Sequence, residues 1–160
     1  MTRYRVPLLL LLLALSACAG GRGGSALYRR DIGTASGPDA RMLAQQVIER
    51  HGYELEQFDE QPEIRLLTKW RPRRPLGDEA ALGITAAESR ILVVARQRAM
   101  TELGPLYNVT LTMENRVRVA GSTDWNETVN TPLFRQYADE ITNDYKTLVT
   151  NIGVRRFECC

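Results

Sequence analysis

The sequence contains one histidine, His51, and three cysteines, which stand at positions 18, 159 and 160 near the ends of the chain. It has no Cys-x-x-Cys or His-x-x-x-His spacing, so we expect no metal site. No serine or cysteine lies in the strand-turn-helix context of a catalytic nucleophile. We therefore predict a protein that is not an enzyme and has no cofactor. Paired carboxylates brought together by folding are the one catalytic arrangement that the sequence leaves open.

The single histidine precedes Gly52 at the expected end of a helix. A partly charged imidazole at that place interacts favourably with the helix dipole and with the last carbonyl groups. We expect His51 to cap the helix rather than to take part in catalysis.

A long apolar run occurs only once, from Val6 to Leu15, and it follows Arg3 and Arg5. The run is too short for a permanent transmembrane helix, and no stretch after Cys18 is long enough to span a bilayer. Two arginines, a short apolar segment and small residues at its end are typical of a secretory signal peptide. We assign residues 1–17 to this signal.

The end of the signal, Leu15-Ser16-Ala17-Cys18, resembles the lipobox of bacterial lipoproteins. The resemblance implies that the Cys18 thiol carries a diacyl group with chains such as palmitate, and that Cys18 becomes the first residue of the mature chain. Two or three acyl chains hold a protein on a membrane. Ala19, rather than Asp, resembles the pattern sorted to the periplasmic face of the outer membrane. The alternative is an ordinary signal peptide that leaves Cys18 as an incidental thiol.

The mature chain has no excess of charge of either sign. The full sequence has 21 Lys and Arg against 19 Asp and Glu, and two of the arginines leave with the signal, so 19 remain of each sign. Net charge therefore does not favour binding to nucleic acid.

The mature chain is long enough for a single domain. Residues 18–37 are rich in Gly, Ser and Ala without apolar periodicity, which predicts a flexible tether after the lipidated cysteine. We place one α+β domain at residues 38–157 and a tail at 158–160. Cys159 and Cys160, which end the chain, could form a vicinal disulfide, crosslink to another chain or remain free.

Apolar spacing predicts helices at both ends of the domain. Proline at the first helical position and apolar residues at helical spacing favour a helix from Pro38 to His51. Thr131-Pro132 resembles an N-cap followed by a first-turn proline, and the helical stripe that follows ends at Gly153.

Four segments between these helices have strand patterns. We expect two strands around residues 53–58 and 64–70 that form a hairpin, with Trp70 on the same face as Ile64. A long loop at 71–87 follows, and then strands at 89–100 and 107–119. The prediction is a two-layer α+β sandwich in which both helices cover one face of a four-stranded antiparallel sheet.

Basic residues on the other face of this sheet, together with Arg71, Arg73 and Arg74 of the long loop, are the candidate partner-binding residues. Leu92 and Val94 lie among them, and an apolar strip between arginines is typical of a binding surface. The partner would be an envelope protein or an anionic envelope component. The alternative is a solvated face whose charges prevent aggregation. The candidate residues are Arg65, Lys69, Arg71, Arg73, Arg74, Arg96, Arg98, Arg116 and Arg118.

A second hypothesis is a carrier or sensor that holds a small apolar ligand between the sheet and the C-terminal helix. Residues of these types at these spacings more often form an ordinary core. They are Tyr107, Leu111, Met113, Tyr137 and Tyr145.

The order of elements, with Gly52-Tyr53 and Thr68-Lys69-Trp70, resembles envelope lipoproteins with helix-grip domains, such as a lipoprotein of the outer-membrane β-barrel assembly machinery. The resemblance implies a non-enzymatic, lipid-anchored periplasmic protein that binds an envelope protein or supports envelope assembly. It assigns no role to any single residue.

Overall fold

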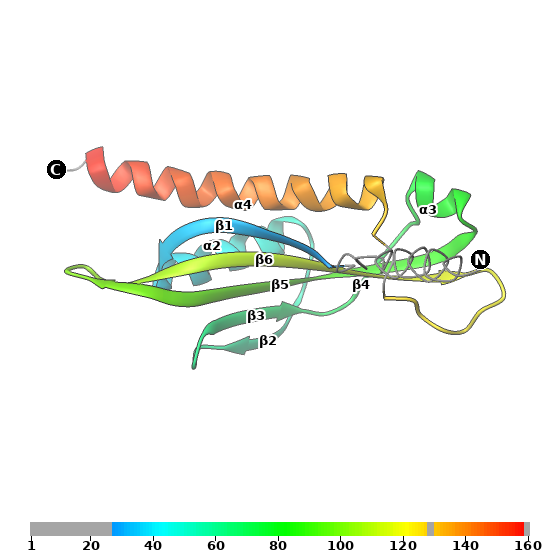
Figure 1. The fold of residues 1–160 in the computed structure, drawn as a ribbon, viewed down its shortest axis with the longest axis horizontal. Coiled ribbons are helices and arrows are strands. Elements are labelled where there is room, and N and C mark those ends of the chain that lie inside the picture. Colours follow the sequence, from blue (N-terminus) through cyan, green and yellow to red (C-terminus); the bar gives the residue numbers. More distant parts are fainter. Residues whose placement is uncertain (1–26, 128–129, 159–160) are drawn as a thin grey trace, which may run out of the picture.

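The computed structural model describes residues 27–127 and 130–158, which form an antiparallel sheet of six strands with helices (Figure 1). The α+β class and the antiparallel sheet are therefore as the sequence predicts. The number of strands is not, because the prediction has four. In chain order the elements are β1 (Tyr28–Ser36), α2 (Gly37–Arg50), β2 (Leu55–Asp59), β3 (Ile64–Thr68), β4 (Arg71–Arg73), α3 (Gly77–Ala81), β5 (Ile84–Thr101), β6 (Gly104–Val119) and α4 (Pro132–Glu158).

The strands lie in the order β1-β6-β5-β3-β2, and β4 pairs with β5. Both α2 and α4 contact the sheet and each other, so they cover the same face (Figure 1). One hydrophobic core lies between them and the sheet, and its strand residues come from β1, β3, β5 and β6. No helix of the described residues lies on the other side of the sheet, which we call the open face.

The first strand lies inside the segment that the sequence predicts to be a tether. Tyr28 pairs with Met113 and Ser36 with Leu106, so β1 forms an edge of the sheet and the folded part begins before Pro38. Tyr28 and Ile32 are buried in the core. The prediction that residues 18–37 form a flexible tether is therefore wrong for residues 28–37, which form β1 and the start of α2.

A bulge explains why apolar spacing does not reveal this strand. The register shifts between Asp31 and Gly33, and Gly33 has a φ of 133°. The buried residues Ile32 and Ala35 are consequently three residues apart, whereas side chains of an unbroken strand return to the same face at every second residue. Between Tyr28 and Ile32, the position on the same face is the exposed Arg30. A search for alternating apolar residues therefore misses it.

Both ends of α2 and the start of α4 lie within one residue of their predicted positions. The Ser36 hydroxyl accepts a hydrogen bond from the Asp39 N–H (3.3 Å) at the start of α2, and Gly52 follows the end of α2 with a φ of 69°. The Thr131 hydroxyl accepts one from the Phe134 N–H (3.3 Å) at the start of α4, as the N-cap prediction requires. However, α4 continues through Gly153 to Glu158.

The strands and the long loop also differ in detail from the prediction. The hairpin of β2 and β3 is confirmed, and β5 and β6 are longer than the two strands expected there. The predicted loop at 71–87 contains β4, α3 and the start of β5.

A substitution in β1 tests whether it belongs to the fold. Ile32→Ala should lower the free energy of unfolding by about 2–5 kcal/mol, because it leaves a cavity in a packed core. Thr34→Ala, at an exposed position of the same strand, should change it by less than about 0.5 kcal/mol. Urea unfolding followed by circular dichroism measures both. Equal, small effects would show that residues 28–36 do not contribute to the folded domain.

Candidate interaction surface

The centre of the open face is an apolar strip on β3 and β5. Leu67 lies opposite Leu92 in the register, and Val94 is the next residue of β5 on the same face. All three side chains are half-buried although no helix of the described part of the chain covers them. Apolar side chains side by side on an uncovered sheet face are typical of a protein-binding surface.

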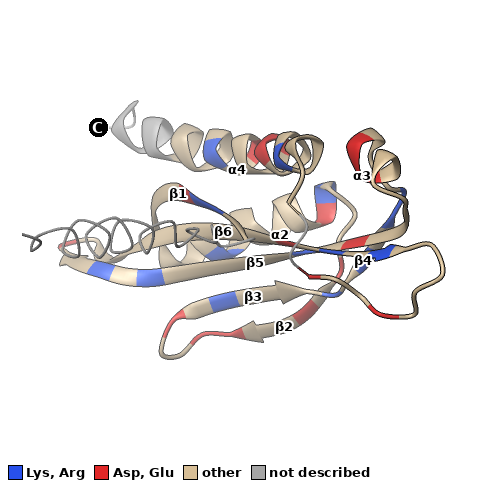
Figure 2. Cartoon of the chain, turned by 45° about the vertical axis from the view of Figure 1, so that its right-hand side comes forward, with Lys and Arg blue, Asp and Glu red and all other residues tan. Residues whose placement is uncertain are grey.

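Ion pairs between neighbouring strands or segments surround this strip. Strand pairing places Arg90 opposite Glu114, and Glu88 opposite Arg116, on the open face. These two arginines therefore each have a carboxylate on the adjacent strand that offsets their charge. Figure 2 likewise shows basic and acidic residues interspersed over the molecule. The shortest nitrogen–oxygen distances are 2.6 Å for Arg90–Glu114, 2.5 Å for Arg116–Glu88 and 2.5 Å for Arg96–Glu63.

Two tryptophans stack on these arginines. The guanidinium carbons of Arg90 and Arg116 lie 4.4 Å and 4.3 Å from the centre of the Trp70 ring. Arg116 also lies 4.8 Å from the centre of Trp125, and Arg118 lies 5.2 Å from it. Cation–π contacts at these distances order the long arginine side chains and leave the tryptophans half-buried. Tryptophan and arginine are also the residues that contribute most at protein interfaces.

The position of Trp70 corrects the prediction, which has it on the core side with Ile64. Leu67 pairs with Leu92, and Arg71 pairs with Ser89. The four residue steps from Leu67 to Arg71 therefore lie opposite only three residue steps of β5. This extra residue between β3 and β4 reverses the alternation of side chains. Trp70 therefore lies on the open face, whereas Arg71 lies on the helix side.

The structure does not bring the nine candidate residues together. Arg65, Arg96, Arg116 and Arg118 belong to the open face, and Lys69 pairs with the exposed Glu54 at 3.0 Å. Within the described residues, Arg65, Arg74 and Arg98 are exposed and form no ion pair. Arg71 and Arg73 project to the helix side, where Arg71 donates to the His51 carbonyl (2.8 Å). The open face is thus a smaller and more neutral surface than the sequence predicts.

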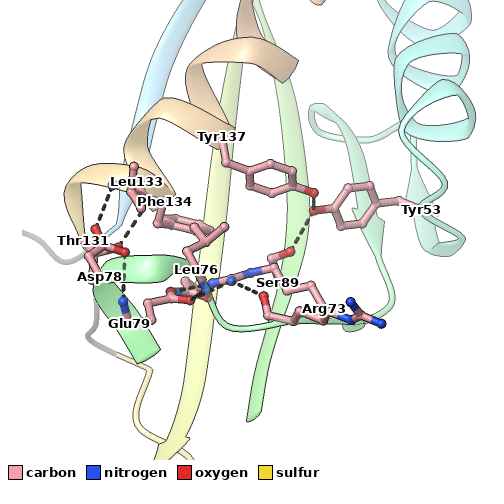
Figure 3. A network of polar contacts seen from close by, with 12 residues as sticks. Tyr53, Arg73, Leu76, Asp78, Glu79, Ser89, Thr131, Leu133, Phe134 and Tyr137 are labelled. Atoms are coloured by element: carbon pink, nitrogen blue, oxygen red, sulfur yellow. Dashed lines mark hydrogen bonds and ion pairs between the residues drawn. The ribbon is translucent and has the colours of Figure 1, made fainter. Parts of the chain in front are cut away.

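Arg73 forms a buried ion pair that the sequence does not reveal (Figure 3). Its two terminal nitrogens donate to the Glu79 carboxylate at 2.7 Å and 2.5 Å, and one also donates to the Asn115 side chain at 2.8 Å. The Glu79 side chain is completely buried, and that of Arg73 is 10% exposed. Asn115 is the residue that interrupts the apolar face of β6, so its side chain serves this ion pair. The cluster joins β4, α3 and β6.

The same network fixes the start of α4. Burial disfavours the charged form of Glu79, but hydrogen bonds from Arg73 and from the Leu76 N–H outweigh it and hold the pKa of Glu79 below its ordinary value of 4.5. Asp78, the neighbouring residue, accepts a hydrogen bond from the Leu133 N–H (2.9 Å) in the first turn of α4. Figure 3 shows these contacts side by side.

Hydroxyl groups join the helix layer to the sheet on the same side. The Tyr53 hydroxyl lies 2.8 Å from the Ser89 hydroxyl and 2.8 Å from that of Tyr137 (Figure 3). Burial raises the pKa of Tyr53 far above its ordinary value, so the hydroxyl stays protonated. His51 is the C-cap residue of α2, as the sequence suggests, and its Nε2 atom lies 2.9 Å from the Asp144 carboxylate of α4.

The residues proposed to line a ligand site belong mainly to the core. Leu111, Met113 and Tyr145 are completely buried, and the Tyr145 hydroxyl donates to the Ala40 carbonyl (2.9 Å). Tyr107 and Tyr137 are partly buried beside the same core. This arrangement favours an ordinary core over a ligand carrier. Cys18, Cys159 and Cys160 lie outside the described residues.

Replacing Glu79 tests the buried ion pair. Glu79→Gln should lower the free energy of unfolding at pH 7 by about 3–5 kcal/mol, because a buried guanidinium loses its counter-charge. Since the pKa of Glu79 is lowered in the folded chain, its contribution is present above pH 4.5 and is lost as the pH falls through the lowered value. The difference between wild type and variant should therefore shrink at about pH 3, as urea unfolding would measure.

The matched control is Glu54→Gln, which removes the partner of Lys69 at an exposed pair. Surface ion pairs of this kind contribute about 0–1 kcal/mol. Equal losses in both variants, or a loss for Glu79→Gln that does not depend on pH, would contradict a special role of the buried pair.

Among the described residues, no helix is both long and apolar enough to cross a membrane, and no three His, Cys, Asp or Glu side chains gather where they could hold a metal ion. Comparison with protein-family models and with curated proteins finds no match for this chain.

Proposed function

We propose that this chain is a lipid-anchored envelope protein, without enzymatic activity, that binds a protein partner through the open face of its sheet. The observation that carries the proposal is the apolar strip of Leu67, Leu92 and Val94 on a face where a tryptophan stacks on two arginines. Such a strip with an aromatic neighbour and a charged rim has the composition of a protein interface.

The charge pairing favours a protein over an anionic lipid or phosphate. Arg90, Arg96 and Arg116 each have a carboxylate within 2.6 Å. A phosphate would have to displace these carboxylates or lie beside them, and like charges repel. A protein surface with apolar and polar groups of its own can cover the strip and leave the ion pairs intact.

The anchor would keep this surface close to a membrane. Tyr28, the first residue of β1, follows Cys18 by ten residue steps, and a chain of this length spans at most about 33–36 Å. If Cys18 carries the lipid, the domain stays at the periplasmic side of the membrane, which we propose to be the outer membrane. The long α4 over the sheet supports the helix-grip resemblance, which implies the same location.

Replacing the lipidated cysteine tests the anchor. In a bacterial host, the wild-type chain should incorporate labelled palmitate and sediment with membranes, whereas Cys18→Ala should incorporate none, because the thiol is the acceptor. Radiolabelling and membrane fractionation measure both. A wild-type chain that is cut and released without label would instead indicate an ordinary signal peptide.

Photo-crosslinking tests the open face. A photo-reactive residue at Arg65, which is exposed beside Val94 in the register, should yield a discrete adduct with an envelope protein in intact cells. Leu92→Asp should reduce the yield at least about tenfold, because interface anchors contribute about 2 kcal/mol or more.

The matched control places the same photo-reactive residue at Gln136, an exposed position of α4 on the helix side. It should give no such adduct. An adduct from Gln136 alone, or one that persists in Leu92→Asp, would place the partner elsewhere.

A further inference from the structure

One end of the sheet carries exposed apolar side chains that the open face does not include. Leu82, after α3, is 65% exposed, and Val119, the last residue of β6, is 46% exposed. Together with Trp125 they line one shallow cavity. We call this surface, formed by Leu82, Val119 and Trp125, the Trp125 end.

The first strand starts on the side of the sheet nearer to this end. β1 starts at Tyr28, opposite Met113 of β6, and runs away from Val119 toward the β5–β6 turn. Tyr28 is therefore the residue of β1 that lies nearest to the Trp125 end. Six residues of β6 separate Met113 from Val119, which is about 20 Å at the usual rise of a strand. The ten residue steps from Cys18 to Tyr28, which span up to about 33–36 Å, cover this distance easily.

The second exposed apolar site lies at the opposite end. Met100 and Leu103, at the tip of the β5–β6 hairpin, are 70% and 92% exposed. Nine residues of β6 separate Met113 from Gly104, or about 30 Å in the direction that β1 itself takes. To bring this tip to the membrane, the segment from Cys18 would have to turn back beside β1 and extend almost fully. The anchor thus favours the Trp125 end.

We propose that the Trp125 end rests on the surface of the phospholipid bilayer that carries the acyl chains of Cys18. This inference depends on the lipid anchor proposed above. Tryptophan prefers the headgroup level of a bilayer, where its ring meets acyl chains and its N–H meets water or lipid oxygen. Arg118, stacked on Trp125, is close enough to reach a lipid phosphate.

The contact is mainly apolar. Asp124 and Glu127 are exposed on the same loop as Trp125 and offset the charge of Arg118, so attraction to anionic lipid adds little. The contact needs little affinity of its own, because the anchor supplies a high local concentration of bilayer. It orients the domain with β5 and β6 pointing away from the membrane. The apolar strip of Leu67, Leu92 and Val94 then stays free for a protein, while Arg116 and Arg118, the open-face arginines that stack on Trp125, lie nearest the bilayer.

Tryptophan quenching in vesicles tests this orientation. The mature lipidated chain is placed in vesicles of phosphatidylethanolamine and phosphatidylglycerol, some with brominated acyl chains, and flotation establishes that it is anchored. Trp70→Phe leaves Trp125 as the only tryptophan, and its emission should fall at least twofold. Adding Trp125→Phe and Leu103→Trp moves the only tryptophan to the hairpin tip. The emission of this tryptophan should be the same with and without brominated acyl chains.

Charge substitutions make the test independent of any single tryptophan variant. In the Trp70→Phe background, Leu82→Glu with Val119→Glu should abolish the quenching while the chain still floats, and the matched pair Met100→Glu with Leu103→Glu should leave the quenching unchanged. Circular dichroism confirms that each variant folds.

The outcomes separate the two proposals. A chain that floats without quenching of Trp125, or with quenching at the tip instead, overturns the orientation and leaves the anchor intact. A chain that does not float overturns the anchor and the orientation with it.

Discussion

The antiparallel pairing of β5 with β6 is the interaction on which the rest of the structure depends. It runs from Ile84–Val119 to Thr101–Gly104, and every other strand except β2 attaches to one of these two. Because side chains alternate across a strand, one row of this ladder, which includes Ile91 and Met113, forms the floor of the core under the helices. The other row forms the open face. A single hairpin therefore positions the core and the proposed interface back to back.

Much of this arrangement follows from periodicity in the sequence. Both long helices, the β2–β3 hairpin and the two long strands have clear periodic patterns of apolar residues, which arise because each element buries one side. Prediction failed at β1 and at Trp70, where an extra residue shifts the register. A bulge changes which face the following side chains occupy, and its position depends on the partner strand, which the sequence of one strand does not contain.

The candidate site was predicted less well than the fold, because the sequence does not show which charges are paired. Sequence shows which strand an arginine belongs to but not which carboxylate lies opposite. Arg116 on the open face is paired with Glu88, and Arg73 is buried against Glu79. A basic surface inferred from arginines alone is therefore too large. One signal could have indicated the buried pair: Asn115, a polar residue in the apolar row of β6, needs a hydrogen-bond partner in the core.

The buried pair also bears on the two proposed contacts. Arg73 and Glu79 hold β4 and α3 against β6, while Asp78 holds the start of α4. Leu82 follows α3 directly, and Trp70 immediately precedes β4. A side chain that belongs to the proposed membrane contact and one that belongs to the proposed protein interface thus depend on the same ion pair. Because a buried, well-paired charge resists local opening more than an exposed one, both surfaces are held in a fixed relation. An anchored domain needs this rigidity if contact at one end is to set the direction in which its open face points.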